Sequence, residues 1–182
     1  MEFEGFPKIP RLFRDIVITE KLDGTNAQIL IDEDGTIQAA SRKRLITPED
    51  DNFGFAAWVK ENADELRGLG PGRHFGEWWG AGIGRRYDQT EKHFSLFNAG
   101  RWTPTNPAPS CCRVVPVLYK GPFITRVCNL TLEDLTLHGS QAAPGFMRPE
   151  GIIVYHTAGR VLFKATIEHD TLSKTVAQQE TH

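Results

Sequence analysis

The residues with the clearest chemical potential lie between Glu20 and Asn26, where the chain reads E-K-L-D-G-T-N. Lys21 comes directly after a short apolar, β-branched run, and a glycine follows at position 24. A rigid strand end followed by a glycine turn leaves room for a ligand beside the lysine amine. Alone, the K-x-D-G pattern also fits an ordinary strand end and turn, since about 5 % of chains of this length contain it by chance.

A nucleophilic lysine needs help from its surroundings, because an amine with the ordinary pKa of about 10.4 is almost entirely protonated near neutral pH. One cation about 5 Å away, at an effective dielectric constant of about 20, disfavours the charged amine by about 3 kcal/mol. That energy corresponds to a decrease of about two pKa units. Lys164 or a bound Mg²⁺ could provide such a charge. An ionised Asp23 nearby would oppose it, and would instead orient other groups or lie near the metal.

Five further short motifs follow the lysine along the chain. They contain Arg42 in S-R-K-R, Glu77 in F-G-E-W-W-G, Phe97 in F-S-L-F-N, Glu150 in P-E-G-I-I-V and Lys164 in L-F-K. The two carboxylates offer hard oxygen atoms for sugar hydroxyls or hydrated Mg²⁺, and the phenylalanine could stack on a base. Lys164 lies in an apolar run, and a buried lysine is rare unless it is paired or functional. Taken separately, each motif also fits a solvated turn or ordinary core packing.

The elements that must position these residues are short strands and two helices. Alternating or β-branched runs predict strands at 15–20, 25–31, 36–41, 73–79, 93–97, 113–119, 151–156 and 160–164. Helical spacing of apolar residues predicts helices at 51–66, capped by Asp51 or Asn52, and at 130–137, capped by Asn129. Hairpin turns favour antiparallel pairing, so the chain is predicted to be an α+β domain.

The composition fits an ordinary globular domain and excludes several classes of protein. Of the 182 residues, 40 % are hydrophobic and 24 % are charged, which is enough for a sizeable core. With 21 Lys and Arg against 23 Asp and Glu, the net charge of −2 excludes a strongly basic nucleic-acid-coating protein but allows a local basic groove. No apolar run is long enough for a membrane span, and the acidic N-terminus does not fit a secretory signal. The three cysteines, with no C-x-x-C pair, favour reduced thiols in a cytoplasmic protein.

The order of the six motifs resembles the covalent nucleotidyltransferase superfamily, which contains ATP-dependent RNA and DNA ligases and mRNA capping enzymes. Within it, E-K-x-D-G-T-N, the arginine 21 residues after the lysine, G-E-W-W-G and F-S-L-F-N most resemble the RNA ligase family. The similarity extends from about Asp15 to Glu168. It implies an α+β nucleotidyltransferase (adenylation) domain, built of antiparallel sheets flanked by helices.

The resemblance implies a nucleotide site with ATP as the AMP donor and Mg²⁺ or Mn²⁺ as the metal. Lys21 would attack the α-phosphorus of ATP, form a lysyl–AMP phosphoramidate and release pyrophosphate. Glu77 would bind the ribose hydroxyls, and Phe97 would stack on adenine. Glu150 would bind the divalent metal, and Lys164 would contact the α-phosphate. The lysines and Glu150 would thus form the catalytic set.

The resemblance also implies a nucleic-acid site, where AMP passes to a 5′-phosphate and a 3′-hydroxyl then attacks to form the phosphodiester. Arg42 would bind a phosphate of the nucleic-acid end, Asn26 would assist sealing, and Glu20 would flank the adenine pocket. Four further cations could bind the nucleic-acid backbone: Lys43, Arg44, Arg85 and Arg86. Trp78 and Trp79 could stack on bases or pack in the core. RNA is favoured over DNA as the substrate.

The sequence departs from the family pattern in two ways. Position 166, where the family often has a second lysine, is threonine, and Lys174 could supply the missing phosphate contact. Only 18 residues follow Lys164, which predicts one minimal nucleotidyltransferase domain over 1–182 without an appended OB domain. Self-adenylylation is then a firmer expectation than efficient strand joining. An accessory protein could supply the nucleic-acid-binding surface that an appended domain would otherwise provide.

Other functions stay open at this point. A DNA nick ligase and a guanylyltransferase would use the same covalent step on different substrates. A non-catalytic nucleotide- or nucleic-acid-binding module would keep the fold without the chemistry. The lysine nucleophile and the two carboxylates argue against such a module, because binding alone needs no strand-end lysine.

Overall fold

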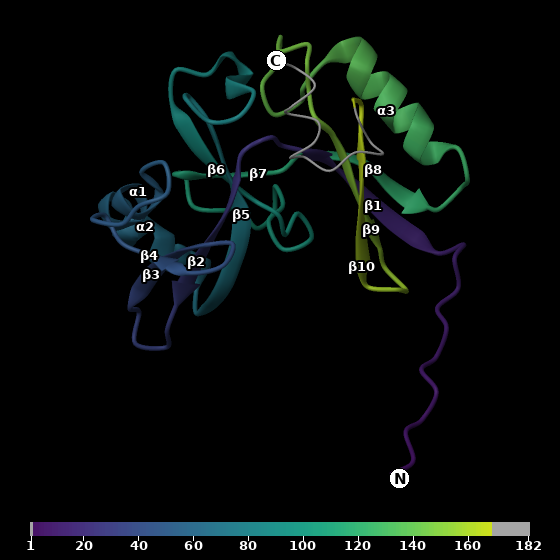
Figure 1. Ribbon diagram of the computed structural model, residues 1–182, viewed down its shortest axis with the longest axis horizontal. Coiled ribbons are helices and arrows are strands. Elements are labelled where there is room, and N and C mark those ends of the chain that lie inside the picture. The colour runs from purple at the N-terminus through teal and green to yellow at the C-terminus, as the bar shows by residue number, and fades with distance from the viewer. Residues whose placement is uncertain (1, 169–182) are drawn as a thin grey trace.

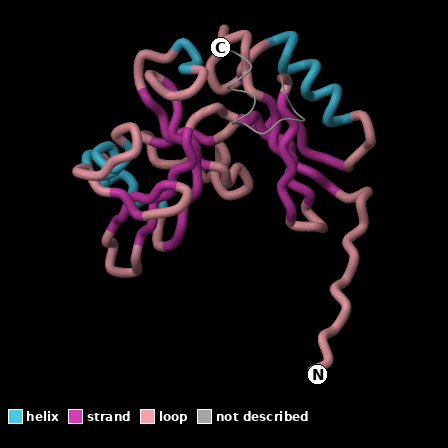
Figure 2. Tube along the Cα trace, in the orientation of Figure 1, coloured by secondary structure: helices cyan, strands magenta, loops and turns pink. Residues whose placement is uncertain are grey.

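The computed structural model describes residues 2–168, which form two β-sheets side by side (Figure 1). The strands are β1 (Asp15–Lys21), β2 (Thr25–Ile31), β3 (Ile37–Ser41), β4 (Leu45–Ile46), β5 (Gly72–Gly80), β6 (Lys92–Leu96), β7 (Cys112–Val114), β8 (Val117–Pro122), β9 (Gly151–His156) and β10 (Val161–Thr166). The helices are α1 (Phe55–Glu61), α2 (Ala63–Leu66) and α3 (Val127–His138), with short 3-10 turns at Arg67–Leu69 and Arg86–Asp88. Figure 2 shows these helices at the outside of the sheets, which confirms the predicted α+β class. None of the described helices has the length and apolar character needed to span a membrane.

The first sheet has the strand order β10-β9-β1-β8, and every neighbouring pair is antiparallel. Because side chains alternate between the two faces of a strand, the two faces of this sheet carry different sets of residues. Ile18 and Ile152 lie on an apolar face and are fully buried in a cluster with Val127 and Leu135 of α3. Lys21 is three residues after Ile18 on β1, so its side chain lies on the opposite, open face.

The second sheet has the strand order β4-β3-β2-β5-β6-β7. Its buried face packs against α1, where Ile29 of β2, Trp78 of β5 and Phe55 of α1 share one core cluster. The residues that alternate with these, among them Asn26 on β2 and Glu77 on β5, lie on the other face. Each sheet therefore has one face closed by a helix and one face open.

The predicted strand at 113–119 is wrong as a single element. It divides at Val115 and Pro116 into β7 and β8, which belong to different sheets. The amide of Val115 still donates to Leu96 in the second sheet, whereas the carbonyl of Pro116 already accepts from Glu20 in the first. Proline has no amide hydrogen to continue a ladder, so the chain changes sheets here. β7 also pairs in parallel with β6, the one parallel pair among the described strands.

The two predicted helices have different limits from those expected. The helix at 51–66 begins only at Phe55, because Phe53 and Gly54 have left-handed backbone angles, and it breaks at Asn62 into α1, α2 and a 3-10 turn. Asp51 does serve this helix, since its carboxylate accepts hydrogen bonds from two amides of the first turn. The other helix begins at Val127, so Asn129 lies inside it and is not its N-cap.

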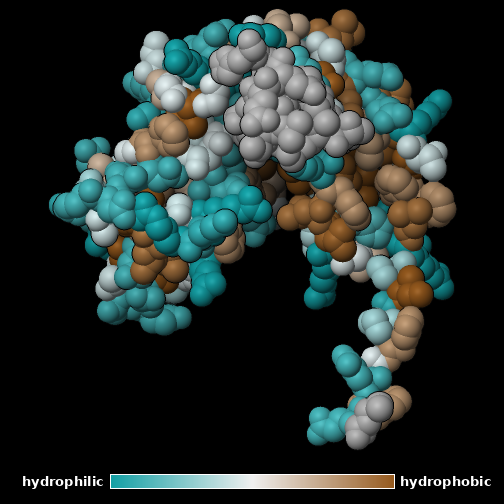
Figure 3. Space-filling view, viewed as in Figure 1, coloured by the Kyte–Doolittle hydropathy of each residue, from teal (hydrophilic) through white to brown (hydrophobic). Residues whose placement is uncertain are grey.

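The two sheets meet where β1 leads into β2. Leu22 is buried there in a cluster with Trp79, Tyr87, Val115 and Phe146. The molecular surface is hollowed between the two sheets (Figure 3), and Lys21 stands directly before the connection that joins them. The fold thus places the open face of each sheet on the sides of one cleft.

Candidate active site

Lys21 and Glu150 form the closest charged pair in the cleft. Lys21 is the last residue of β1 and lies opposite Gly151, the first residue of β9, so antiparallel pairing brings Glu150 to the end of β1. The Lys21 Nζ donates to Glu150 Oε2 over 2.7 Å. The side chains are only 19 % and 10 % exposed. Two residues that are 129 positions apart in the sequence are therefore held together by strand register.

Gly151 allows β10 to approach the start of β9 closely. Its φ of +155° is unusual for a residue with a side chain, and a Cβ placed on it would lie 2.2 Å from the Ala165 carbonyl oxygen of β10. Thr166 pairs directly with Gly151, so the position of the family's second lysine lies in the same row as Lys21. Lys174, the suggested substitute, lies outside the described residues.

Lys164 lies on the open face but is not buried. It pairs with Ile153, whose partner on β1 is Thr19, two residues before Lys21. Residues two apart on a strand share a face, so both lysines face the cleft. The expected burial of Lys164 is wrong, because β10 is an edge strand whose residues around this position are exposed.

Across the cleft, the second sheet presents Asn26, Glu77 and Phe97. Asn26 pairs with Glu77, and its Nδ2 donates to Glu77 Oε2 over 2.9 Å. Glu77 is 7 % exposed, so its carboxylate is held firmly beside the amide. Phe97 follows β6 and is 43 % exposed, and its backbone amide donates to the Phe75 carbonyl over 2.9 Å. The structure thus brings the predicted sugar and base ligands onto one face.

The predicted cations differ in how free they are. Arg42 and Lys43 follow β3 and are exposed, and neither has an ion-pair partner among residues 2–168. Arg44 instead binds both carboxylate oxygens of Asp50 through its two terminal nitrogens. Arg86 is exposed. Arg42 and Lys43 are thus exposed cations at the end of β3, whereas Arg44 is already paired.

Arg85 has an internal role instead of a free place on the surface. Its guanidinium donates to the Arg148 carbonyl and to Glu168, and its backbone amide donates to the Asp23 carboxylate over 3.1 Å. The amide of Asp23 in turn donates to the Tyr87 hydroxyl over 2.9 Å. Burial raises the pKa of Tyr87, so its hydroxyl keeps its proton. Asp23 thus has the orienting role, since it fixes the loop after β5 against the end of β1.

Trp78 and Trp79 pack in the core and do not reach the cleft. Trp78 is 2 % exposed and lies among Phe55 and Trp58. Trp79 is fully buried, and its indole nitrogen donates to the Ser95 hydroxyl over 2.9 Å. Of the two alternatives left open by the sequence, core packing is therefore correct for both tryptophans.

Glu20 turns its carboxylate away from Lys21, because it stands one position earlier on β1 and neighbouring residues of a strand point to opposite faces. The side chain is buried, and its Oε2 accepts hydrogen bonds from the backbone amides of Gln141 and Ala142, both over 2.9 Å. Burial raises the pKa of Glu20, although hydrogen bonds from Ser140 and from the two amides oppose this effect. The carboxylate therefore holds the 140–143 turn behind the sheet.

Replacing Glu20 by glutamine should make the stability of the protein less dependent on pH. A carboxyl with a raised pKa binds its proton more tightly in the folded chain, so the free energy of unfolding falls as the pH rises from its ordinary pKa of 4.5 through the raised value. Glutamine keeps an oxygen for the two amides and removes this titration. Urea unfolding at a series of pH values should show a flatter profile for Glu20→Gln. The exposed Glu33→Gln variant should keep the wild-type profile, and an unchanged profile in both variants would contradict the prediction.

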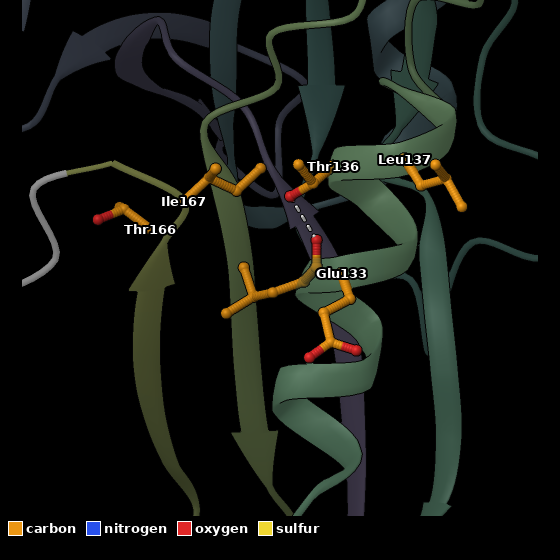
Figure 4. Close-up of a pocket in the computed structure, with 6 residues that line it drawn as sticks. Glu133, Thr136, Leu137, Thr166 and Ile167 are labelled. Atoms are coloured by element: carbon orange, nitrogen blue, oxygen red, sulfur yellow. Dashed lines mark hydrogen bonds between the residues drawn. The ribbon is translucent and has the colours of Figure 1, made fainter.

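A separate pocket of about 540 Å³ lies between α3 and the end of β10 (Figure 4). It is lined by Leu132, Glu133, Thr136, Leu137, Thr166 and Ile167. None of the side chains predicted to be catalytic lines it.

Comparison with known protein families identifies the family of the chain. The sequence profile of the RNA ligase family matches residues 14–166. The chain belongs to the RNA ligase family. The matched range agrees with the span over which the ordered motifs were found, from Asp15 to Glu168. None of the curated proteins compared with the chain matches it.

Solved structures of Naegleria gruberi RNA ligase share the fold of this RNA ligase family member. An apo structure has 18 % sequence identity and a TM-score of 0.60, and it covers 93 % of this chain and 52 % of its own. A structure with ATP and Mn has 18 % identity and a TM-score of 0.59, with 92 % and 52 % covered. A structure with AMP and Mn has 18 % identity and a TM-score of 0.58, with 94 % and 52 % covered. The chain therefore spans about half the length of these ligases.

Three residues beside the predicted site residues were not singled out by the sequence analysis. Tyr87 anchors Asp23, but a lone tyrosine in a glycine-rich loop gives no signal of this contact. Ile153 lies on the open face between Thr19 and Lys164, and Phe75 lies beside Phe97. Alternation along 151–156 and along 73–77 could have found the last two, because residues two apart from a known site residue share its face.

Proposed function

We propose that this chain is an ATP-dependent RNA ligase that works through a lysyl–AMP intermediate on Lys21. The observation that carries the proposal is the amine itself, which ends β1 on the open face of the cleft with its Nζ 2.7 Å from Glu150. The opposite side of the cleft offers Glu77 and Phe97, the acceptor and the ring that a nucleoside needs. Family membership supports the same assignment.

The ion pair describes the resting state of the nucleophile. A carboxylate next to an ammonium group favours the charged form, which has no lone pair to attack with. Attack therefore requires Glu150 to be drawn away from Nζ and the amine to lose a proton. The nitrogen then forms a bond to the α-phosphorus of ATP, the bond from that phosphorus to the β-bridging oxygen breaks, and pyrophosphate leaves with the electron pair.

The donor set at Glu150 fits a divalent metal that is completed by the substrate. Among residues 2–168 no group of three or more His, Cys, Asp or Glu side chains could hold a metal alone. Mg²⁺ usually takes one or two carboxylates together with waters and substrate phosphates, so a single carboxylate beside the triphosphate suffices. When bound, Mg²⁺ or Mn²⁺ supplies positive charge that offsets the negative charge building on the phosphate oxygens. Glu150 is the residue that would hold it.

The other residues bind and orient the nucleotide. Glu77, held by Asn26, accepts hydrogen bonds from the ribose hydroxyls, and the half-exposed ring of Phe97 stacks on adenine. Lys164 faces the cleft from β10 and contacts the α-phosphate. β9 lies between β10 and β1. Lys164 therefore neutralises the phosphate from the other side of β9, without competing with Lys21 for Glu150.

Two further transfers complete ligation. An oxygen of the RNA 5′-phosphate attacks the phosphorus of the lysyl adenylate, and Lys21 leaves with its electron pair restored. The RNA 3′-hydroxyl then attacks the activated 5′-phosphate, and AMP leaves. Arg42, exposed beside Asn26 by the register of β2 and β3, binds the phosphate of the RNA end, and Asn26 assists the sealing step.

Labelling with α-³²P nucleotides tests this proposal. The protein incubated with labelled ATP and Mg²⁺ or Mn²⁺ should acquire an acid-labile label, and adding RNA with 5′-phosphate and 3′-hydroxyl ends should release the label as AMP with a joined product. Label from GTP but not from ATP would instead indicate a guanylyltransferase. Joining of nicked DNA but not RNA would indicate a DNA ligase. Binding of ATP without any label would indicate a non-catalytic module.

A further inference from the structure

Phe75 is an aromatic residue of the cleft that the nucleotide site does not use. It lies on β5 two residues before Glu77, so the two side chains share the open face of the sheet. Its side chain is 50 % exposed, whereas the alternating residues His74 and Trp78 are buried. An exposed aromatic ring on an open sheet face offers a surface on which another ring can stack.

The neighbours of Phe75 form a flat row across the sheet. Phe97 lies opposite it on one side, where the Phe97 amide donates to the Phe75 carbonyl. Gln28 of β2 pairs with it on the other side, and its Nε2 donates to the Ser41 carbonyl over 2.9 Å. This hydrogen bond holds the Gln28 amide toward β3. The row therefore offers a second aromatic ring next to the proposed adenine ring, with a polar group on its far side.

Exposed cations lie on two sides of this row. Arg73 lies two residues before Phe75 on the same face of β5, and Arg42 and Lys43 follow β3 beyond β2. All three are exposed, and within the described range 2–168 none of them forms an ion pair. Arg67, by contrast, pairs with Asp64. Unpaired cations around an aromatic ring are the combination that binds single-stranded nucleic acid.

We propose that Phe75 is the stacking platform for a nucleobase at the RNA end that is being joined. The inference rests on the proposed function, because it assigns the base of ATP to Phe97. Phe75 lies next to that ring, Arg73 lies beside Phe75 along β5, and Arg42 and Lys43 lie beyond β2. A base on Phe75 therefore has cations for its phosphates on two sides. Stacking does not read the sequence, so the platform accepts any base.

Direct RNA binding by the full chain tests the platform without requiring catalysis. The probe is a short 5′-phosphorylated RNA with 2-aminopurine at its terminal position, whose fluorescence falls when the base stacks. Phe75→Ala should abolish this quenching and weaken RNA binding by about 10-fold or more, in line with the usual contribution of one stacked base. Phe75→Trp should restore both signals, whereas Phe75→Leu, which keeps an apolar side chain, should not.

Controls separate the platform from folding and from the nucleotide pocket. Phe3 is 96 % exposed in the N-terminal arm, and Phe3→Ala should bind RNA as the wild type does. Thermal unfolding of each variant reports its folding. The inference is overturned if Phe75→Ala or Phe75→Leu binds like the wild type, if the wild type does not quench the probe, or if Phe75→Ala weakens ATP labelling as much as RNA binding. A lack of ATP label in the wild type would end the proposed function alone, because the RNA measurement needs no ATP.

Discussion

Replacing Lys21 by alanine should abolish transfer of label from ATP to the protein, by about 10³-fold or more, because the substitution removes the nitrogen that attacks the α-phosphorus in the proposed mechanism. Lys21→Arg should be equally inactive. Arginine keeps a cation that can pair with Glu150, so this variant preserves the contact that spans 2.7 Å in the wild type while removing a usable nucleophile. The measurement is acid-labile label per mole of protein.

Two observations would distinguish this outcome from general damage. Lys60 is an exposed lysine on α1, which covers the face of the second sheet opposite to the cleft, and Lys60→Ala should label as the wild type does. The circular dichroism and unfolding temperature of Lys21→Arg should stay close to those of the wild type. Labelling of Lys21→Arg at the wild-type level would place the nucleophile elsewhere and would refute the assignment.

Replacing Gly24 by alanine should destabilise the fold and remove activity together. A Cβ at this position would lie 2.4 Å from the Trp78 carbonyl oxygen and 2.9 Å from Glu77 Cγ and Trp79 Cβ. Backbone atoms of β5 cannot move away from it without breaking the pairing with β2 that holds Glu77 beside Asn26. Overpacking of this kind costs about 2–4 kcal/mol, which corresponds to a decrease in Tm of about 5–15 °C. Calorimetry and the labelling assay should show both losses.

Gly68→Ala is the matched control for this substitution. Its Cβ would lie 3.6 Å from Pro109 Cγ, an ordinary van der Waals distance, and its backbone is not left-handed. This variant should change the free energy of unfolding by less than about 0.5 kcal/mol and should keep full labelling. Equal stability of Gly24→Ala and Gly68→Ala would show that β1 and β5 are not closely packed at the junction.

Much of the fold was predictable because its strands alternate. The ranges at 15–20, 25–31 and 151–156 differ from the observed strands by at most one residue, since each has a buried face and an open one. The run at 113–119 did not reveal its division into two strands. The chain changes sheets at Pro116, and the local sequence does not show that its two halves belong to different sheets. The helix at 51–66 failed for a related reason, since the left-handed Phe53 has no local sequence signal.

The candidate site was predictable as a set of residues but not as an arrangement. The order of short motifs identified Lys21 and Glu150, and the antiparallel register of β1 and β9 then joined them. Exposure could not be predicted in the same way. Lys164 is exposed because β10 is an edge strand. Arg85 already has hydrogen-bond partners, because Asp23 and the Arg148 carbonyl both lie beside it. Both outcomes depend on long-range packing.

The chain passes between the two sheets twice in residues 2–168, at 22–24 and at 115–116. Every ladder hydrogen bond of a sheet otherwise stays within that sheet. A hinge motion at these two connections would leave both registers unchanged, but it would also have to rearrange the buried cluster at the junction and the contacts of Arg85 with Arg148 and Glu168. Glu150 moves with one lobe and Glu77 with the other. A change in the angle between the two sheets would therefore alter the separation of Glu150 and Glu77, and Lys21 lies directly before one of the two connections.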